Sequence, residues 1–222
     1  MSYKPSKQAI KARKDLEHLV PSLCDMAQRG RGFRNWYREA TVAIERVCGR
    51  YGYDVERFTC ALSALSPRVA VRRNVALLEM MTRHDIAGPC PAVVGLSDTW
   101  RKAWGFLSGS ESVSEFVAIG QGLTQSTSMK TGSFAANLLG DEYAVTIDVW
   151  MARAFGIDAE KLFGSRPLYW ACKDIVTEVA GIVGMTPAQC QAAIWHTIAF
   201  DSGRLTMGDF ASLLGEYFDM RG

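Results

Sequence analysis

The sequence contains no apolar run that approaches the roughly 20 residues needed to cross a membrane as a helix. Its first 15 residues are basic but include no apolar stretch, so they lack the central feature of a secretory signal. With 48% hydrophobic and 22% charged residues, the composition is that of an ordinary globular protein. We therefore expect a cytoplasmic protein.

Metal-binding spacings are also missing. The six cysteines form no Cys-x-x-Cys pair, and the three histidines are isolated from one another and from the cysteines. We expect no metal and no other cofactor. Most of the cysteines lie in apolar segments, which predicts reduced core residues. They are Cys24, Cys48, Cys60, Cys90, Cys172 and Cys190.

A net charge of +2 conceals a strong asymmetry along the chain. Residues 1–83 hold 16 Lys and Arg against 8 Asp and Glu, and the remainder holds 9 against 15. The basic residues gather in segments 4–14, 29–38 and 68–73, where a polyanion would bind first. Solvated helix faces are the alternative. Aromatic residues alternate with arginines over 33–38, and this favours nucleic acid, because rings stack on bases while arginines hold phosphates.

Apolar periodicity predicts an all-α fold, because helical spacing recurs throughout and no alternating segment is longer than residues 143–147. About ten helices suit two helical lobes with a central cleft. Asp54 and the pair Thr186-Pro187 are expected to begin helices, and Pro21 to interrupt one. The predicted helices cover 6–28, 35–49, 55–65, 69–83, 97–107, 112–119, 167–182, 186–199 and 206–219, and two more begin near residues 130 and 148.

Two polar residues in segment 128–155 stand near predicted helix starts. Lys130 opens one apolar-faced helix, and Asp148 opens another 18 residues later. The partial positive charge of a helix N-terminus eases the deprotonation of a lysine and keeps an aspartate ionised. Such a pair suits a nucleophilic amine beside a charged stabiliser, if the helices bring the two face to face. A solvated lysine and an ordinary helix cap are the alternative.

Lys130-Thr131, followed by Asp148 in the setting Ile147-Asp148 to Arg153, resembles the catalytic half of the helix-hairpin-helix DNA glycosylases of the endonuclease III type. The resemblance implies that Lys130 attacks the sugar C1′ and that Asp148 activates it and steadies the developing cation.

Residues 58–74 are similar to that family's apolar helix, which ends in Leu-Ser and leads into a segment facing the damaged base pair. The similarity extends over about residues 55–156. It implies a central lobe, 56–146, that carries a hairpin-like element, and a second lobe formed by 1–55 with 147–222.

Two departures separate the chain from that family. The glycine-rich hairpin before the lysine is replaced by residues 124–129, TQSTSM, whose hydroxyls can bind a phosphate in its place. Only Cys172 and Cys190 lie near the C-terminus, so no iron–sulfur cluster is expected. The pattern is closer to small phage-encoded relatives than to housekeeping repair enzymes.

Candidate contact residues follow from the same comparison and from side-chain chemistry. Arginine suits phosphate, and aromatic rings cover an extruded base, although Pro67 as a mere helix terminator and tryptophan as a core residue explain parts of the pattern equally well. Predicted DNA contacts are Arg68, Arg72, Arg73, Asn74, Ser126, Ser128 and Thr131; predicted base-pocket residues are Trp36, Tyr37, Ser66 and Trp150.

Three functions remain open at this stage. The first is a glycosylase, with or without lyase activity, that acts on a modified or damaged base extruded from double-stranded DNA. The second is a phage enzyme that builds modified thymines on the same fold. The third is a DNA-binding protein without activity, in which Lys130 contacts a phosphate. In each case we expect a monomer.

Overall fold

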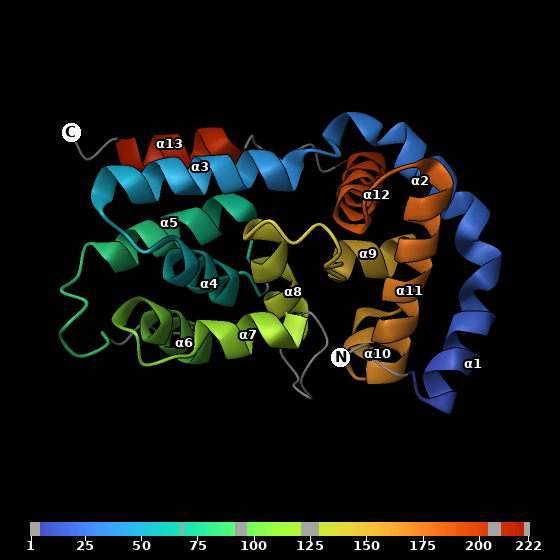
Figure 1. Cartoon of the computed structure of the whole chain (residues 1–222), viewed down its shortest axis with the longest axis horizontal. Coiled ribbons are helices and arrows are strands. Elements are labelled where there is room, and N and C mark those ends of the chain that lie inside the picture. Colours follow the sequence, from blue (N-terminus) through green and yellow to red (C-terminus); the bar gives the residue numbers. More distant parts are fainter. Residues whose placement is uncertain (1–4, 68, 92–96, 121–128, 204–209, 220–222) are drawn as a thin grey trace. The chain divides into compact units, whose positions relative to one another are not determined.

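The computed structural model describes residues 5–67, 69–91, 97–120, 129–203 and 210–219. Within these ranges every regular element is a helix and no strand occurs (Figure 1). The predicted all-α fold is confirmed. Residues 143–147, the longest alternating segment, have no regular structure. Among the described helices, none combines the length and the apolar character that crossing a membrane requires.

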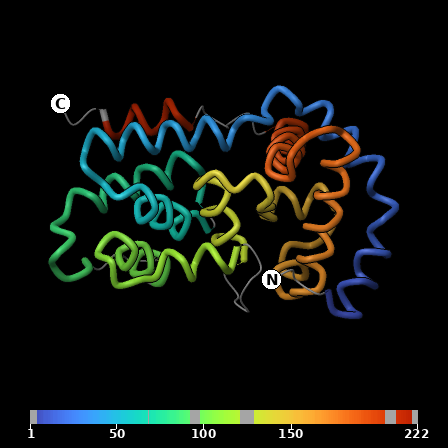
Figure 2. Tube along the Cα trace, in the orientation of Figure 1, coloured from blue at the N-terminus to red at the C-terminus, as the bar shows by residue number. Residues whose placement is uncertain are grey.

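The chain divides into two compact units, and it passes from one to the other three times (Figure 2). Unit 1 comprises Met1–Tyr37 and Gly140–Thr206, and unit 2 comprises Arg38–Leu139 and Met207–Gly222. The lobes expected from the sequence were 1–55 with 147–222, and 56–146. Residues 38–55, 140–146 and the C-terminal segment therefore fall in the other unit than expected. The C-terminal segment does so because the last helix packs on helices of unit 2, where the Tyr51 hydroxyl donates a hydrogen bond to the Phe218 carbonyl.

Unit 1 is built around the helix α11. Side chains along α11 such as Tyr169, Ile175 and Val179 are almost fully buried, and α1, α2 and α12 pack against this helix. The bounds are α1 Lys7–Leu16, η1 Glu17–Leu19, α2 Val20–Arg29, η2 Arg31–Phe33, α9 Val149–Ala154, α10 Ala159–Phe163, α11 Arg166–Val183 and α12 Pro187–Asp201.

Local signals set the helix ends of unit 1 largely as predicted. Pro21 stands in the first turn of α2, and the predicted helix over 6–28 is interrupted just before it by the short η1. Thr186 and Gln189 form a reciprocal capping box at the start of α12, with Pro187 in the first turn. The five-residue α10, capped by Asp158, was not predicted.

Unit 2 surrounds α4. Every residue of α4 from Phe58 to Leu65 is buried, and the helix packs against α5, α6, α7 and α8. The Asp54 carboxylate caps α4 as predicted, accepting from the Arg57 amide at 2.8 Å. The bounds are α3 Trp36–Tyr51, whose first two residues fall in unit 1, α4 Val55–Leu65, α5 Val71–Thr82, α6 Ser97–Ser108, α7 Val113–Gly120, α8 Met129–Leu138 and α13 Phe210–Asp219.

Helices α7 and α8 touch backbone to backbone. A Cβ atom on Gly132 would lie 2.7 Å from the Phe116 carbonyl oxygen and 2.7 Å from the Gly120 nitrogen, closer than non-bonded atoms approach. The neighbouring Ser133 hydroxyl donates to the Gly120 carbonyl at 3.0 Å in the interior. The absence of a side chain at Gly132 therefore fixes the position of α8.

We expect Gly132→Ala to destabilise the protein by at least about 2 kcal/mol, because backbone atoms of α7 must move to admit the methyl group. Gly49→Ala is the matched control. Gly49 lies in helix α3 of the same unit and its added Cβ would meet nothing within 4 Å. That substitution should be neutral or stabilising by about 0.5–1 kcal/mol. Urea unfolding of both variants measures the difference, and equal effects would contradict the close crossing.

Candidate functional site

Lys130 is the second residue of α8 and is half-buried. Its Nζ donates to the Ser66 hydroxyl at 2.7 Å and lies 3.4 Å from the Ser66 carbonyl oxygen. The same nitrogen lies 5.6 Å from the centre of the Phe134 ring. Ser66 is the residue at which the buried helix α4 ends. Two of the predicted site residues, Lys130 and Ser66, are therefore brought together within unit 2.

Asp148 caps the start of α9. Its Oδ1 accepts from the amides of Trp150 at 2.9 Å and Met151 at 3.0 Å, and its Oδ2 accepts from the Trp195 indole nitrogen at 2.7 Å. Both oxygens are thus held by donors, which fixes the carboxylate in one orientation. Trp195 was not among the predicted site residues, because nothing in the sequence links positions 148 and 195.

An aromatic group adjoins this carboxylate. The Trp150 and Trp195 rings meet edge to face with centroids 6.1 Å apart, and the Arg153 guanidinium carbon lies 4.3 Å from the centre of the Trp150 ring. Both tryptophans are half-exposed. Trp150, predicted for the base pocket, therefore has a partly accessible ring beside Asp148.

Lys130 belongs to unit 2 and Asp148 to unit 1. Each side chain is ordered by contacts inside its own unit. Their approach across a shared cleft stays a prediction.

Tyr37 has a different environment from the one expected of a base-pocket residue. Only 8% of it is exposed, and its hydroxyl donates to the Gln191 side-chain oxygen at 2.7 Å in the interior. This burial raises the pKa of Tyr37. The half-buried Trp36 ring stands edge-on to it. Because almost none of the Tyr37 ring is accessible to a base, we assign Tyr37 to the core of unit 1.

The predicted DNA contacts on α5 divide into three kinds. Arg72 is exposed and forms two hydrogen bonds with Glu216 of α13, at 2.8 and 2.9 Å, which raise the pKa of its guanidinium. Asn74 is only 4% exposed and is therefore an interior residue rather than a surface contact. Arg73 is exposed. Of the other predicted contacts, Thr131 is half-buried on α8, and Arg68, Ser126 and Ser128 lie outside the described residues.

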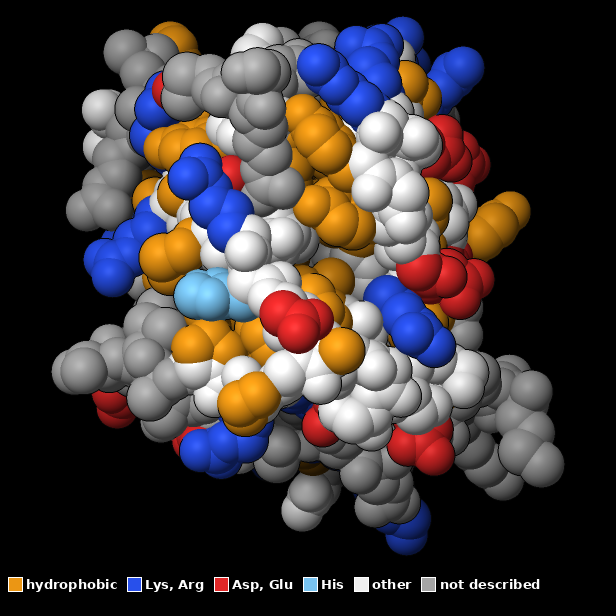
Figure 3. Space-filling model, turned by 90° about the vertical axis from the view of Figure 1, so that its left-hand side faces the viewer, with side chains coloured by type: hydrophobic (Ala, Val, Ile, Leu, Met, Phe, Trp, Pro, Cys, Tyr) orange, Lys and Arg blue, Asp and Glu red, His pale blue; other side chains and the backbone are white. Residues whose placement is uncertain are grey.

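Basic side chains do not form one continuous expanse on the face drawn in Figure 3. Lysine and arginine side chains lie there in separate groups, with acidic and apolar side chains between them.

The cysteines behave largely as predicted: Cys48, Cys60, Cys172 and Cys190 are buried, and burial raises the pKa of each thiol to about 12. Cys90 is exposed.

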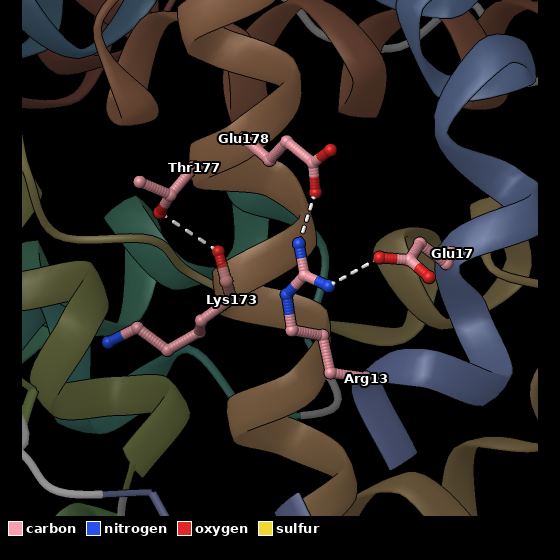
Figure 4. Close-up of polar contacts among 5 residues, drawn as sticks. All are labelled: Arg13, Glu17, Lys173, Thr177 and Glu178. Atoms are coloured by element: carbon pink, nitrogen blue, oxygen red, sulfur yellow. Dashed lines mark hydrogen bonds and ion pairs between the residues drawn. The ribbon is translucent and has the colours of Figure 1, made fainter. Parts of the chain in front are cut away.

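Lys173, which was not predicted as a site residue, is a buried amine. It is 7% exposed, and its Nζ lies 4.6 Å from the centre of the Trp170 ring. Burial lowers the pKa of Lys173 to about 8, partly offset by Asp141 and Asp174. Figure 4 shows its side chain on a different side of α11 from Glu178, which pairs with Arg13 at 2.5 Å. The signal in the sequence was the charged pair Lys173-Asp174 within the otherwise apolar segment 168–176.

We expect Lys173→Met to stabilise the protein at pH 7 by on the order of 3 kcal/mol, the cost of keeping a charged amine buried. The native pKa is about 8 and the ordinary value is 10.5. Between these values the unfolded chain holds the proton more firmly than the native one. The wild type therefore gains stability as pH rises through that window, and the advantage of Lys173→Met should shrink. Urea unfolding at pH 7, 9 and 10.5 measures the difference in free energy of unfolding between the variant and the wild type. A difference that stays constant with pH would contradict the lowered pKa of Lys173.

No curated protein and no solved structure matches the chain. One family model matches residues 20–202, from the start of α2 to the end of α12, and this range includes both Lys130 and Asp148. Because the match covers most of the 222 residues, the chain belongs to the family of unknown function DUF7178.

Proposed function

We propose that the protein is a DNA glycosylase-like enzyme of the helix-hairpin-helix type, which acts on a base extruded from duplex DNA. Lys130 is its nucleophile and Asp148 its stabilising carboxylate. The observation that carries the proposal is the environment of Lys130. Its amine lies in the first turn of α8, half-buried over an aromatic ring, and is held at 2.7 Å by the hydroxyl of Ser66.

This environment suits a nucleophile for two reasons. The hydrogen bond that the amine donates to Ser66 restricts it to one position, which reduces the entropy lost when it meets a sugar carbon. Contact with the Phe134 ring also gives the amine a partly apolar setting. An ordinary surface lysine has neither a fixed partner nor a partly apolar setting.

The proposed chemistry needs no group beyond the chain and its substrate. The neutral amine forms a bond to C1′ as the bond from C1′ to the base breaks, and the base leaves with that electron pair and takes up a proton. Loss of an amine proton and opening of the sugar ring give an imine. Elimination then transfers a C2′ proton to solvent, forms a C2′–C3′ double bond, breaks the C3′–O bond and releases the 3′ phosphate. Asp148 assists lysine deprotonation and stabilises positive charge on the sugar.

We expect the protein to form a covalent adduct with a duplex that contains an abasic site when borohydride is present, because reduction converts the imine to a stable amine. Lys130→Ala should abolish the adduct. Lys102→Ala is the matched control, since Lys102 also lies on a helix of unit 2, half-buried, with its Nζ 4.7 Å from the centre of the Phe116 ring. It should form the adduct at the wild-type rate. Gel electrophoresis under denaturing conditions detects the product.

Other outcomes of this experiment would redirect the proposal. An adduct that persists in Lys130→Ala, or is lost equally in Lys102→Ala, contradicts the role of Lys130. A change in the mass of a base without strand cleavage indicates a base-modifying enzyme. Salt-sensitive binding that leaves the DNA unchanged indicates a binding protein, and Lys130→Ala should then reduce the salt dependence by about one counterion.

We expect Asp148→Asn to slow adduct formation by about 100-fold or more while leaving the affinity for duplex DNA unchanged. Asparagine retains an oxygen to cap α9 but loses the negative charge and an acceptor for Trp195. Asp158→Asn makes the same exchange at the exposed cap of α10, where Asp158 accepts from the Lys161 amide at 3.0 Å. Single-turnover kinetics of the two variants compare them, and similar rates would show that Asp148 is only a helix cap.

A further inference from the structure

A second feature of unit 1 lies on α12, one residue beyond Trp195. The chain before η2 approaches α12 very closely at Gly30, where an added Cβ would lie 2.0 Å from the Ala193 carbonyl oxygen and 2.6 Å from the Thr197 hydroxyl. The Gly30 carbonyl then accepts from the Phe33 amide at 2.9 Å. Only glycine permits this approach, which anchors η2 on α12.

This anchoring places the Phe33 ring on the ring of His196, in a nearly parallel stack with an angle of 10° between the planes. Phe33 nevertheless remains 46% exposed, and Phe200, one helical turn beyond His196, is 57% exposed. Burial lowers the pKa of His196. The Phe33 ring is therefore held in one orientation while almost half of the residue stays open to solvent.

Two arginines of the same segment flank that ring. Arg31 and Arg34 are both exposed. Arg31 donates to the Val183 carbonyl at 3.1 Å and to the Gln28 side-chain oxygen at 3.2 Å, and Arg34 donates to the Arg31 carbonyl at 3.2 Å. All three acceptors are uncharged, so these bonds position the guanidinium groups without neutralising them. Along the chain, the exposed aromatic residue Phe33 therefore stands between two arginines whose charges these bonds leave in place.

We propose that Phe33, together with Arg31 and Arg34, forms a contact surface for single-stranded nucleic acid, in which a base stacks on Phe33 and the adjoining phosphates meet the two arginines. The combination of an accessible ring and fixed positive charges is the usual basis of sequence-tolerant strand binding. The choice of nucleic acid over another polyanion rests on the proposed function. The surface itself includes neither Lys130 nor Asp148.

An acidic protein partner is a weaker match to these residues. Arginines alone would serve such a partner, and the Phe33 ring would then add only apolar area. A nucleic acid strand uses both features, because every base has a flat face and every link has a phosphate. The stacking contact predicts a property that charge alone does not, namely a preference for a strand with bases over an equally charged strand without them.

The experiment compares a fluorescent thymidine oligonucleotide of about 12 nucleotides with an abasic strand of the same length, by anisotropy over a range of salt concentrations. The wild type should bind the thymidine strand at least about tenfold more tightly. Phe33→Leu, which keeps an apolar side chain but removes the flat ring, should abolish that preference. Arg34→Gln should lower the affinity for both strands and reduce the slope of log affinity against log salt concentration by about 0.7.

Matched controls come from α1 of the same unit. Ile10→Ala removes another exposed apolar side chain, and Lys11→Gln removes another exposed charge. Both should bind as the wild type does, and thermal unfolding of each variant shows that it is folded. Equal binding of the two strands by the wild type, or an unchanged preference in Phe33→Leu, would overturn the proposal. So would concentration-dependent self-association that Phe33→Leu removes, since it would identify the face as a contact between copies.

This test is independent of the borohydride experiment. A strand preference that depends on Phe33 supports the surface even if no covalent adduct forms. An adduct that depends on Lys130, without any strand preference, supports the proposed function and contradicts the proposed strand-binding surface.

Discussion

The burial of α4 from Phe58 to Leu65 is the constraint on which unit 2 depends. Eight consecutive residues of this helix are buried, and they include polar ones such as Thr59 and Ser63, which are fully inaccessible. Moving the helix would expose large side chains such as Phe58 and Leu62, at about 1.5–3 kcal/mol each. Its C-terminal end at Ser66 is therefore a fixed point. Lys130 is tied to that point from a helix whose own position is set by the contact of Gly132 with α7.

In unit 1, helix α12 packs on the central helix α11 and positions two of the proposed functional side chains. Its consecutive residues Trp195 and His196 point about 100° apart around the helix axis. Trp195 donates to Asp148 at the start of α9, while His196 stacks on Phe33 of η2. One buried helix therefore orients both the proposed catalytic carboxylate and the proposed strand-binding ring. The capping box at Thr186 and the close approach of Gly30 hold α12 and its neighbours in that arrangement.

The features that the sequence predicted well are local. The caps at Asp54 and Thr186, the interruption before Pro21 and the exact span of α4 depend on residues within a few positions of one another. The features it missed require partners distant in the chain. The bond of Trp195 to Asp148 joins residues 47 apart, and the burial of Lys173 depends on how several helices pack around α11. Periodicity shows that one face of a helix is apolar, but it does not identify the residues that pack against that face.

Contacts between distant residues also match part of the charge asymmetry of the chain. Three arginines from its basic first part pair with acidic residues from its acidic last part, and each pair lies within one unit: Arg13 with Glu178, Arg29 with Asp201 and Arg72 with Glu216. Part of the apparent polyanion-binding charge is therefore matched inside the fold. Exposed pairs of this kind contribute little stability, about 0–1 kcal/mol each. Their main consequence is that the proposed attraction for a nucleic acid depends on arginines with uncharged partners, such as Arg31 and Arg34, rather than on the net charge of the segment.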